Sequence, residues 1–333
     1  MRQSLASRNL RWLFTLLLIL PLLVQAQEPL PSWKDGPSRQ AIEAFVSAVT
    51  KEGVKDYVPP AERIAVFDND GTLWSEQPMY FEVLFALDEV KRLAPQHPEW
   101  KEQQPFKAVL EGDQKALAES GTEGLMKIIG ATHSGMSTEQ FIEQSQGWLA
   151  KAVHPRSKKP YTEMVYQPML ELLAYLRANG FRTYIVSGGE VAFMRAFAEE
   201  VYGIPPEQVI GTTFESQFQD KDGQLSIQRL PKLAHNDDGP GKPVSIDTII
   251  GRRPIFAFGN SDGDLQMLQW TMAGNGKRFA GLVHHTDATR EWAYDRESKI
   301  GRLDKALDAA KAGNWTVVDM AGEWSRVYPF ENN

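Results

Sequence analysis

The chain has 333 residues, a net charge of −7 and no cysteine. Its acidic balance disfavours nucleic acid and anionic membrane surfaces as partners. The lack of cysteine excludes disulfides and a thiol-linked lipid anchor, so stability must come from a large hydrophobic core.

Residues 1–26 have the pattern of a secretory signal peptide. Three arginines precede an apolar run over residues 12–24, which is followed by a small-residue cleavage site at Ala26. The run is short for a membrane span of about 20 residues and contains Pro21, although an uncleaved anchor is the alternative. We therefore expect a periplasmic or secreted protein without a stable membrane anchor after cleavage, with a net charge of −10 once the three arginines are removed.

The mature chain is predicted to begin with a flexible lead over residues 27–37 and a helix over residues 38–49. Residues 64–67 are apolar without alternation, which is typical of a strand buried on both faces of a parallel sheet. Asp68 and Asp70 follow, on the same side of the chain. Two carboxylates at such a short distance repel each other unless a cation lies between them or one of them carries a proton. The alternative is that both aspartates only end the strand and cap a turn.

The segment between this strand and the next strand–helix unit has helical periodicity. Helices are predicted over residues 81–93, 106–117 and 124–129, and a capping box at Ser137 predicts another to about residue 152. The aromatic cluster before them either packs against the core or binds a cationic or planar group. It consists of Trp74, Tyr80 and Phe81.

Three later segments also carry polar residues at predicted element ends. A strand ends in Ser187 and Gly188, where the hydroxyl binds an anion or caps a helix. Lys242 precedes a proline-started helix, a placement that is locally unfavourable unless an anion lies between them; Lys232 is the fallback. A third buried strand ends in an acidic loop beginning at Asn260.

The remaining expected elements are strands and a hairpin. The hairpin pairs residues 213–219 with residues 224–230, and further strands are predicted over residues 279–284 and 315–320. His284 and His285, at the end of a strand, either contact the site or simply end the strand.

Four motifs in this order resemble the signature of the haloacid dehalogenase superfamily, and most of all its phosphoserine-phosphatase-like branch. They are D-N-D-G-T from Asp68, the strand-end Ser187, Lys242, and G-N-S-D-G-D from Gly259. The resemblance implies an α/β fold with a three-layer, Rossmann-like parallel sheet. Residues 27–74 and 161–333 would form this core, and residues 75–160 a helical cap that closes over the site and selects the substrate.

The resemblance also implies roles for individual residues. Asp68 would attack phosphorus and form an aspartyl-phosphate, and Asp70 would protonate the leaving group and then activate water. Ser187, Gly188 and Lys242 would bind the phosphoryl oxygens. The dehalogenases of the superfamily lack the second aspartate, so dehalogenation is not expected here.

The implied cofactor is Mg²⁺, held by the Asp68 carboxylate, the Asp70 backbone carbonyl and the last motif. Family members usually carry Asp where this chain has Asn260, which offers an oxygen ligand without charge. Asp264 would ligate directly or through water, and Asp262 is a weaker substitute. Ligand charge count alone predicts that Asn260→Asp binds Mg²⁺ more tightly.

Together these features predict an exported, Mg²⁺-dependent phosphatase acting on a small-molecule phosphomonoester. Two alternatives stay open: transfer of the phosphoryl group to an acceptor alcohol, and a non-catalytic phosphate- or metal-binding protein of the same fold. Nucleic acid is not an expected partner.

Overall fold

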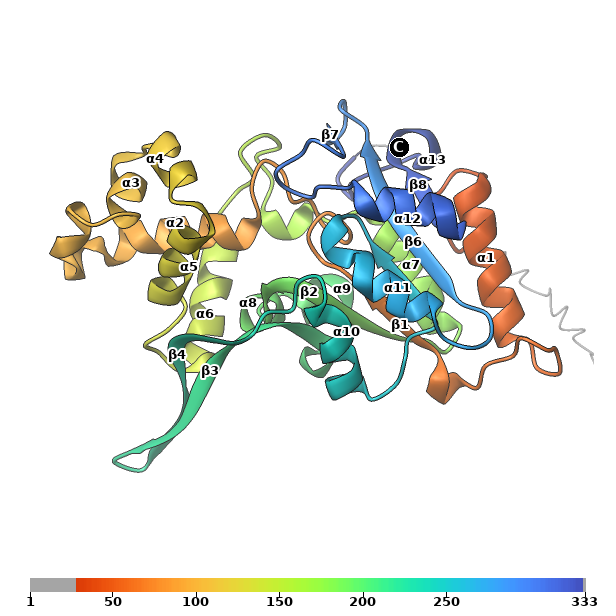
Figure 1. Cartoon of the computed structure of the whole chain (residues 1–333), viewed down its shortest axis with the longest axis horizontal. Coiled ribbons are helices and arrows are strands. Elements are labelled where there is room, and N and C mark those ends of the chain that lie inside the picture. The colour runs from red at the N-terminus through yellow and green to blue at the C-terminus, as the bar shows by residue number, and fades with distance from the viewer. Residues whose placement is uncertain (1–27, 332–333) are drawn as a thin grey trace, which may run out of the picture.

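The computed structural model describes residues 28–331, so the predicted signal peptide lies outside the described residues. A mainly parallel sheet forms its centre, with helices against both faces (Figure 1). The strands are β1 Ile64–Phe67, β2 Arg182–Glu190, β3 Val209–Lys221, β4 Gln224–His235, β5 Phe256–Gly259, β6 Phe279–Thr286, β7 Ala293–Tyr294 and β8 Thr316–Asp319. Their order is β4-β3-β2-β1-β5-β6-β7, with β8 pairing β6, and β4 and β7 are antiparallel to their neighbours. The predicted α/β class with a Rossmann-like parallel sheet is confirmed.

β1 lies in the middle of this sheet, paired in parallel with β2 on one side and β5 on the other. Its side chains alternate between two hydrophobic clusters. Ala65 and Phe67 join the larger cluster, whereas Ile64 and Val66 join the smaller one on the other face. Both faces are covered, which explains why the strand sequence is apolar without alternation.

Helices cover the sheet on each side of β1. The larger cluster includes residues of α1 Pro37–Thr50, α7 Gln167–Ala178, α8 Val191–Arg195, α9 Ala198–Tyr202 and α13 Met320–Glu323. The smaller cluster includes residues of α11 Leu265–Met272, α12 Lys305–Gly313 and the single π turn Ile246–Ile250, which continues α10 Gly241–Ser245.

Five α-helices lie within residues 75–160, between β1 and α7 in the sequence, and we call these residues the insert. The helices are α2 Phe81–Leu93, α3 Phe106–Glu111, α4 Gln114–Glu119, α5 Gly121–Thr132 and α6 Thr138–Leu149. α2 and the capping box at Ser137 were correctly predicted. The single helix expected over residues 106–117 is wrong, because Gly112 ends α3 with a φ of 71° and Asp113 caps α4.

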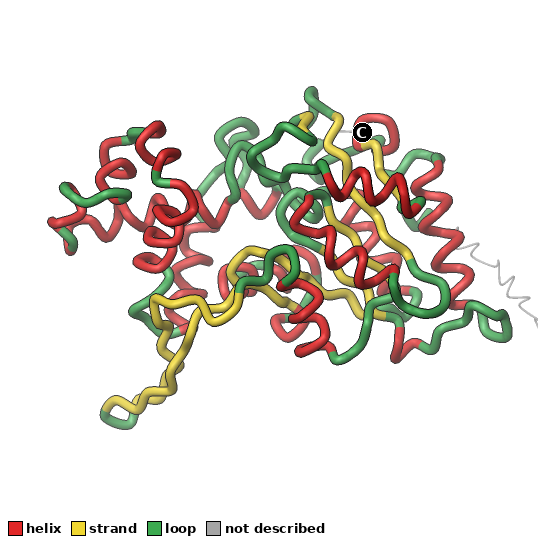
Figure 2. Tube along the Cα trace, viewed as in Figure 1, coloured by secondary structure: helices red, strands yellow, loops and turns green. Residues whose placement is uncertain are grey.

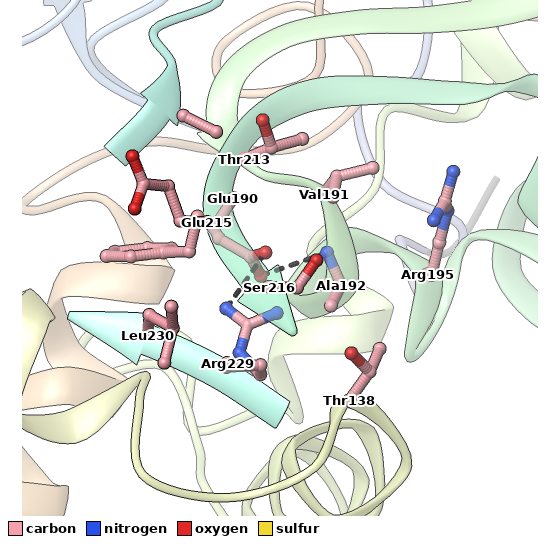
Figure 3. Close-up of a pocket in the computed structure, with 12 residues that line it drawn as sticks. Thr138, Glu190, Val191, Ala192, Arg195, Thr213, Glu215, Ser216, Arg229 and Leu230 are labelled. Carbon is pink, nitrogen blue, oxygen red and sulfur yellow. Dashed lines mark hydrogen bonds and ion pairs between the residues drawn. The ribbon is translucent and has the colours of Figure 1, made fainter. Parts of the chain in front are cut away.

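The β3–β4 hairpin is longer than predicted and projects beyond the sheet (Figure 2). Its second strand also bonds to the insert: the Arg229 N–H donates to the carbonyl of Met136, and the Gly135 N–H donates to the carbonyl of Arg229, both at 3.0 Å. The Arg229 side chain is buried, where it pairs with Glu190 at 3.0 Å and donates to the carbonyl of His133 at 2.7 Å. Figure 3 shows this ion pair in a cavity of about 560 Å³ between the hairpin, β2 and α6. Arg229 therefore links the hairpin, the insert and the core.

The predicted flexible lead is wrong for residues 28–36. Trp33 is buried, donates from its indole to the carbonyl of Pro168 at 2.9 Å and packs edge-on against Trp324 at 5.8 Å. The lead is thus held against the C-terminal part of the chain. No helix within residues 28–331 is long and apolar enough to cross a membrane.

Candidate active site

The predicted site residues lie at the carboxyl ends of three adjacent parallel strands. Asp68 directly follows β1, Ser187 lies near the end of β2, and Asn260 directly follows β5. From β1 the chain builds the sheet outward through β2 and β3, and later in the opposite direction through β5 and β6. Such a reversal opens the crevice in which α/β sheets bind ligands.

Lys242 joins these strand ends. Its ammonium donates to Asp68 Oδ1 at 2.6 Å, to Asp264 Oδ1 at 2.7 Å and to the carbonyl of Val186 at 2.9 Å. The side chain is only 1% exposed. Burial by itself would lower the pKa of Lys242, but the carboxylates of Asp264 and Asp68 raise it above its ordinary value. The lysine is therefore charged, and it is fixed by three oxygens in the site.

Asp68 is buried beside this lysine, and Asp70 is half-buried. Burial, together with the negative charge of Asp264, raises the pKa of Asp68 to about 8 in spite of Lys242. Burial also raises the pKa of Asp70 to about 6, opposed by a hydrogen bond of 2.8 Å from the Trp74 indole to Asp70 Oδ1. An anionic Asp68 in this site needs more positive charge than Lys242 supplies.

The turn that contains Ser187 approaches Asp70 through Gly189, whereas Gly188 faces Asp238. The Ser187 hydroxyl is buried and accepts the N–H of Gly189 at 3.2 Å. Gly189 itself is so placed that a Cβ on it would lie 3.7 Å from Asp70 Oδ2. The alternative reading of Ser187 as a helix cap is wrong, because the Glu190 side chain caps α8 instead.

The last motif separates its polar residues into different roles. Asp264 Oδ2 accepts the N–H groups of Asn260 and Ser261 at 2.9 and 3.0 Å, and its other oxygen binds Lys242. Both oxygens of this predicted metal ligand thus have protein partners, and Asp264 holds Lys242 and the loop in place. Asp262 accepts the N–H groups of residues 304 and 306 and supports the start of α12.

Asn260 is the last-motif side chain that faces Asp68. Its Oδ1 accepts the Thr72 hydroxyl at 3.1 Å, and the same hydroxyl lies 3.4 Å from Asp68 Oδ2. Within residues 28–331 no group of three or more His, Cys, Asp or Glu side chains is arranged to hold a metal ion. The oxygens of Asp68 and Asn260, in a buried and predominantly acidic site, nevertheless match the hard ligands that Mg²⁺ takes.

Two glutamates near the site were not predicted. Glu82, in the first turn of α2, accepts the N–H of Glu190 at 2.8 Å, and its charge helps to raise the pKa of Asp70 after burial. Its second oxygen lies 3.4 Å from Nε2 of the buried His133. Glu76 is also buried, and it contacts Asn260. An acidic residue in the first helical turn is an ordinary feature, so the sequence held no signal for Glu82.

The remaining candidates are placed as follows. Trp74 and Phe81 are buried against each other at 4.8 Å, so both rings pack in the core, while the Trp74 indole also contacts Asp70. His285 Nε2 donates to the carbonyl of Gly71 at 2.7 Å, next to Asp70, whereas His284 is partly exposed. The fallback Lys232 is wrong, because its exposed side chain pairs with Glu215 away from Asp68.

The family model of the haloacid dehalogenase-like hydrolases matches residues 65–269, which contain all four motifs. The chain belongs to this family. The comparison with curated proteins found no match.

Several solved structures resemble this haloacid dehalogenase-like hydrolase at low sequence identity. A conserved protein of unknown function from Anaerococcus prevotii has a TM-score of 0.48 and 18% identity, covering 84% of this chain and 91% of its own. A protein of unknown function from Bordetella pertussis has a TM-score of 0.47 and 14% identity, covering 78% and 99%. A phosphoserine phosphohydrolase-like protein from Francisella tularensis has a TM-score of 0.37 and 17% identity, covering 68% and 90%.

Proposed function

We propose that this hydrolase is an exported, Mg²⁺-dependent phosphatase that cleaves a small-molecule phosphomonoester through an aspartyl-phosphate. The observation that carries the proposal is the contact of Lys242 with Asp68 and Asp264, beside the half-buried Asp70. A carboxylate nucleophile, a second carboxyl group with a raised pKa, and a fixed cation are the groups that phosphoryl transfer to an aspartate requires.

In the proposed reaction an oxygen of Asp68 attacks phosphorus while the bond to the leaving oxygen breaks. Asp70 donates its proton to that oxygen, which leaves as an alcohol. Asp70 then takes a proton from water, the water oxygen attacks phosphorus, and the Asp68 carboxylate and inorganic phosphate are released. Ser187 and Gly188 would bind the phosphoryl oxygens, the charge of Lys242 would stabilise them, and the raised pKa of Asp70 suits both of its roles.

Asp68 and Asn260 would hold the metal, together with the backbone at Asp70. When bound, Mg²⁺ supplies positive charge that offsets the repulsion between the phosphate dianion and the buried carboxylates. We propose that the insert acts as the cap over this crevice. Glu82 of α2 reaches the Asp70 side of the site, so leaving groups that are neutral or cationic fit better than anionic ones.

A panel of phosphomonoesters tests the proposal, with released phosphate measured in Mg²⁺ and in chelator. Turnover should require Mg²⁺ and disappear in Asp68→Asn, whereas Asp262→Asn changes a carboxylate of the last motif outside the Lys242 cluster and should retain activity. Turnover by Asp68→Asn, or an undiminished rate in chelator, would contradict the mechanism. Adding an acceptor alcohol distinguishes hydrolysis from phosphoryl transfer. A phosphotransferase would release less inorganic phosphate than leaving-group alcohol.

Export is proposed from the signal-peptide pattern of residues 1–26. Expression of the full chain in a bacterial host with fractionation should place the protein outside the cytoplasm. N-terminal sequencing of that fraction should then give a start at Gln27, and an uncleaved membrane-bound chain would contradict the proposal.

A further inference from the structure

Glu76 is a buried carboxylate that the proposed reaction does not use. It is 1% exposed, and its Oε1 accepts both the Asn260 amide Nδ2 and the Tyr294 hydroxyl at 2.7 Å. A carboxylate is unfavourable inside a protein unless hydrogen bonds satisfy it. The two donors are 184 and 218 residues away in the sequence, so distant parts of the chain meet at this group.

Two glycines leave the space that this carboxylate occupies. Gly71 and Gly301 have φ values of 77° and 64°, a conformation that glycine adopts without strain. A Cβ at either position would collide with the Glu76 carboxylate, and at Gly71 it would also collide with the Asn260 amide. The D-N-D-G-T motif is therefore packed directly against the contact between Glu76 and Asn260.

This contact decides which end of the Asn260 amide faces Asp68. An asparagine side chain has a donor end and an acceptor end of nearly the same shape. Because Glu76 takes the donor end, the carbonyl end turns to the Thr72 hydroxyl at 3.1 Å, beside Asp68 Oδ2. An acceptor oxygen is thus directed to the position where a cation would bind.

We propose that Glu76 is a positioning residue that holds the Asn260 carbonyl toward the metal. This inference rests on the proposed Mg²⁺ dependence. It reverses the expectation from ligand charge count, because an aspartate at position 260 would put two carboxylates at hydrogen-bonding distance. Asn260→Asp should therefore bind Mg²⁺ more weakly, unless Glu76 is neutralised at the same time.

A double-mutant cycle tests the pairing with two measurements on the metal-free protein: calorimetric titration with Mg²⁺, and urea unfolding in chelator. Asn260→Asp should weaken Mg²⁺ binding by about tenfold and lower the unfolding midpoint, since the amide that donates to Glu76 is replaced by a second carboxyl group. Glu76→Gln keeps an acceptor for the Asn260 amide but can also turn its own amide group toward Asn260, so a loss of about threefold is expected. In the double variant the introduced glutamine amide can donate to the introduced aspartate, and Mg²⁺ affinity should return to within about threefold of wild type.

Tyr294→Phe is the matched control, because it removes the other hydrogen bond to the same oxygen of Glu76 and leaves Asn260 in contact. Its Mg²⁺ affinity should stay within about twofold of wild type. Tighter binding by Asn260→Asp alone, or purely additive effects in the cycle, would overturn the inference. If the wild-type protein binds no Mg²⁺, the proposed metal dependence fails, and the unfolding measurements alone test the contact between Glu76 and Asn260. Recovery of stability in the double variant supports this contact, and additive losses of stability refute it.

Discussion

Asp68→Asn should make the metal-free protein more stable while abolishing turnover. Burial and the charge of Asp264 raise the pKa of Asp68 from 3.8 to about 8, so between these values the folded protein binds a proton that the unfolded chain does not. Stability therefore falls as the pH rises across this interval. At about 1.4 kcal/mol per pKa unit, the loss by pH 8 has a ceiling of about 6 kcal/mol.

Asparagine cannot ionise and so avoids this loss, and the attraction of Lys242 for the carboxylate is already included in the pKa of Asp68. We expect Asp68→Asn to gain up to about 6 kcal/mol at pH 8 and nothing at pH 4, because the aspartate is then protonated in the folded state. Urea unfolding in chelator from pH 4.5 to 8 measures the difference. A variant less stable than wild type at pH 8, or a gap that does not grow with pH, would refute the reasoning. Asp262→Asn keeps an acceptor oxygen for the N–H groups at the start of α12 but loses the charge that strengthens these hydrogen bonds, so it should instead destabilise by about 1 kcal/mol.

Three further variants probe the rest of the site. Asp70→Asn should lower the rate of alkyl phosphate hydrolysis by about 10²–10⁴ and that of activated aryl phosphates far less, and equal losses for both ester classes would count against proton transfer. In the wild type, the kcat/KM of alkyl esters should fall as the pH rises above about 6, where Asp70 loses its proton. Glu82→Gln should raise kcat/KM for esters with an anionic leaving group relative to neutral ones, and an unchanged ratio would place Glu82 outside the leaving-group side. Arg229→Met should lower the free energy of unfolding by about 3–5 kcal/mol because Glu190 is left buried without its partner. Adding Glu190→Gln should recover part of that loss, and fully additive changes in the free energy of unfolding would contradict the pairing.

The sequence was sufficient for those parts of the site that depend on local pattern. The apolar run of β1 and the aspartates after it are adjacent in the chain, and parallel strands bring their carboxyl ends to one edge of the sheet. Lys242 could be singled out because a lysine at the start of a helix is locally unfavourable. The structure supplies the reason, since Asp68 and Asp264 surround its ammonium.

The parts that the sequence did not reveal depend on contacts between distant segments. Arg229 reads as one more polar residue in a hairpin, and only the packing of that hairpin on the insert buries it against Glu190. Glu76 likewise follows the first motif in a stretch without periodicity, and its meaning depends on Asn260 and Tyr294. Neither position has a local signal, because the helix and strand periods describe only near neighbours.

The charges of the site explain why its groups have to act together. The ammonium of Lys242 is held between Asp68 and Asp264, so much of its charge is already used within the protein. The half-buried Asp70 and the buried Glu76 add carboxyl groups whose pKa values are raised mainly by desolvation. A phosphate dianion entering this crevice would meet more negative than positive charge, and a cation would find oxygens but an incomplete set of ligands. The cation and the phosphate therefore each improve the site for the other. By linkage, each must strengthen the binding of the other by the same factor. Asn260 fits this arrangement, because an oxygen ligand without charge, backed by Glu76, leaves the phosphate one fewer anion to face.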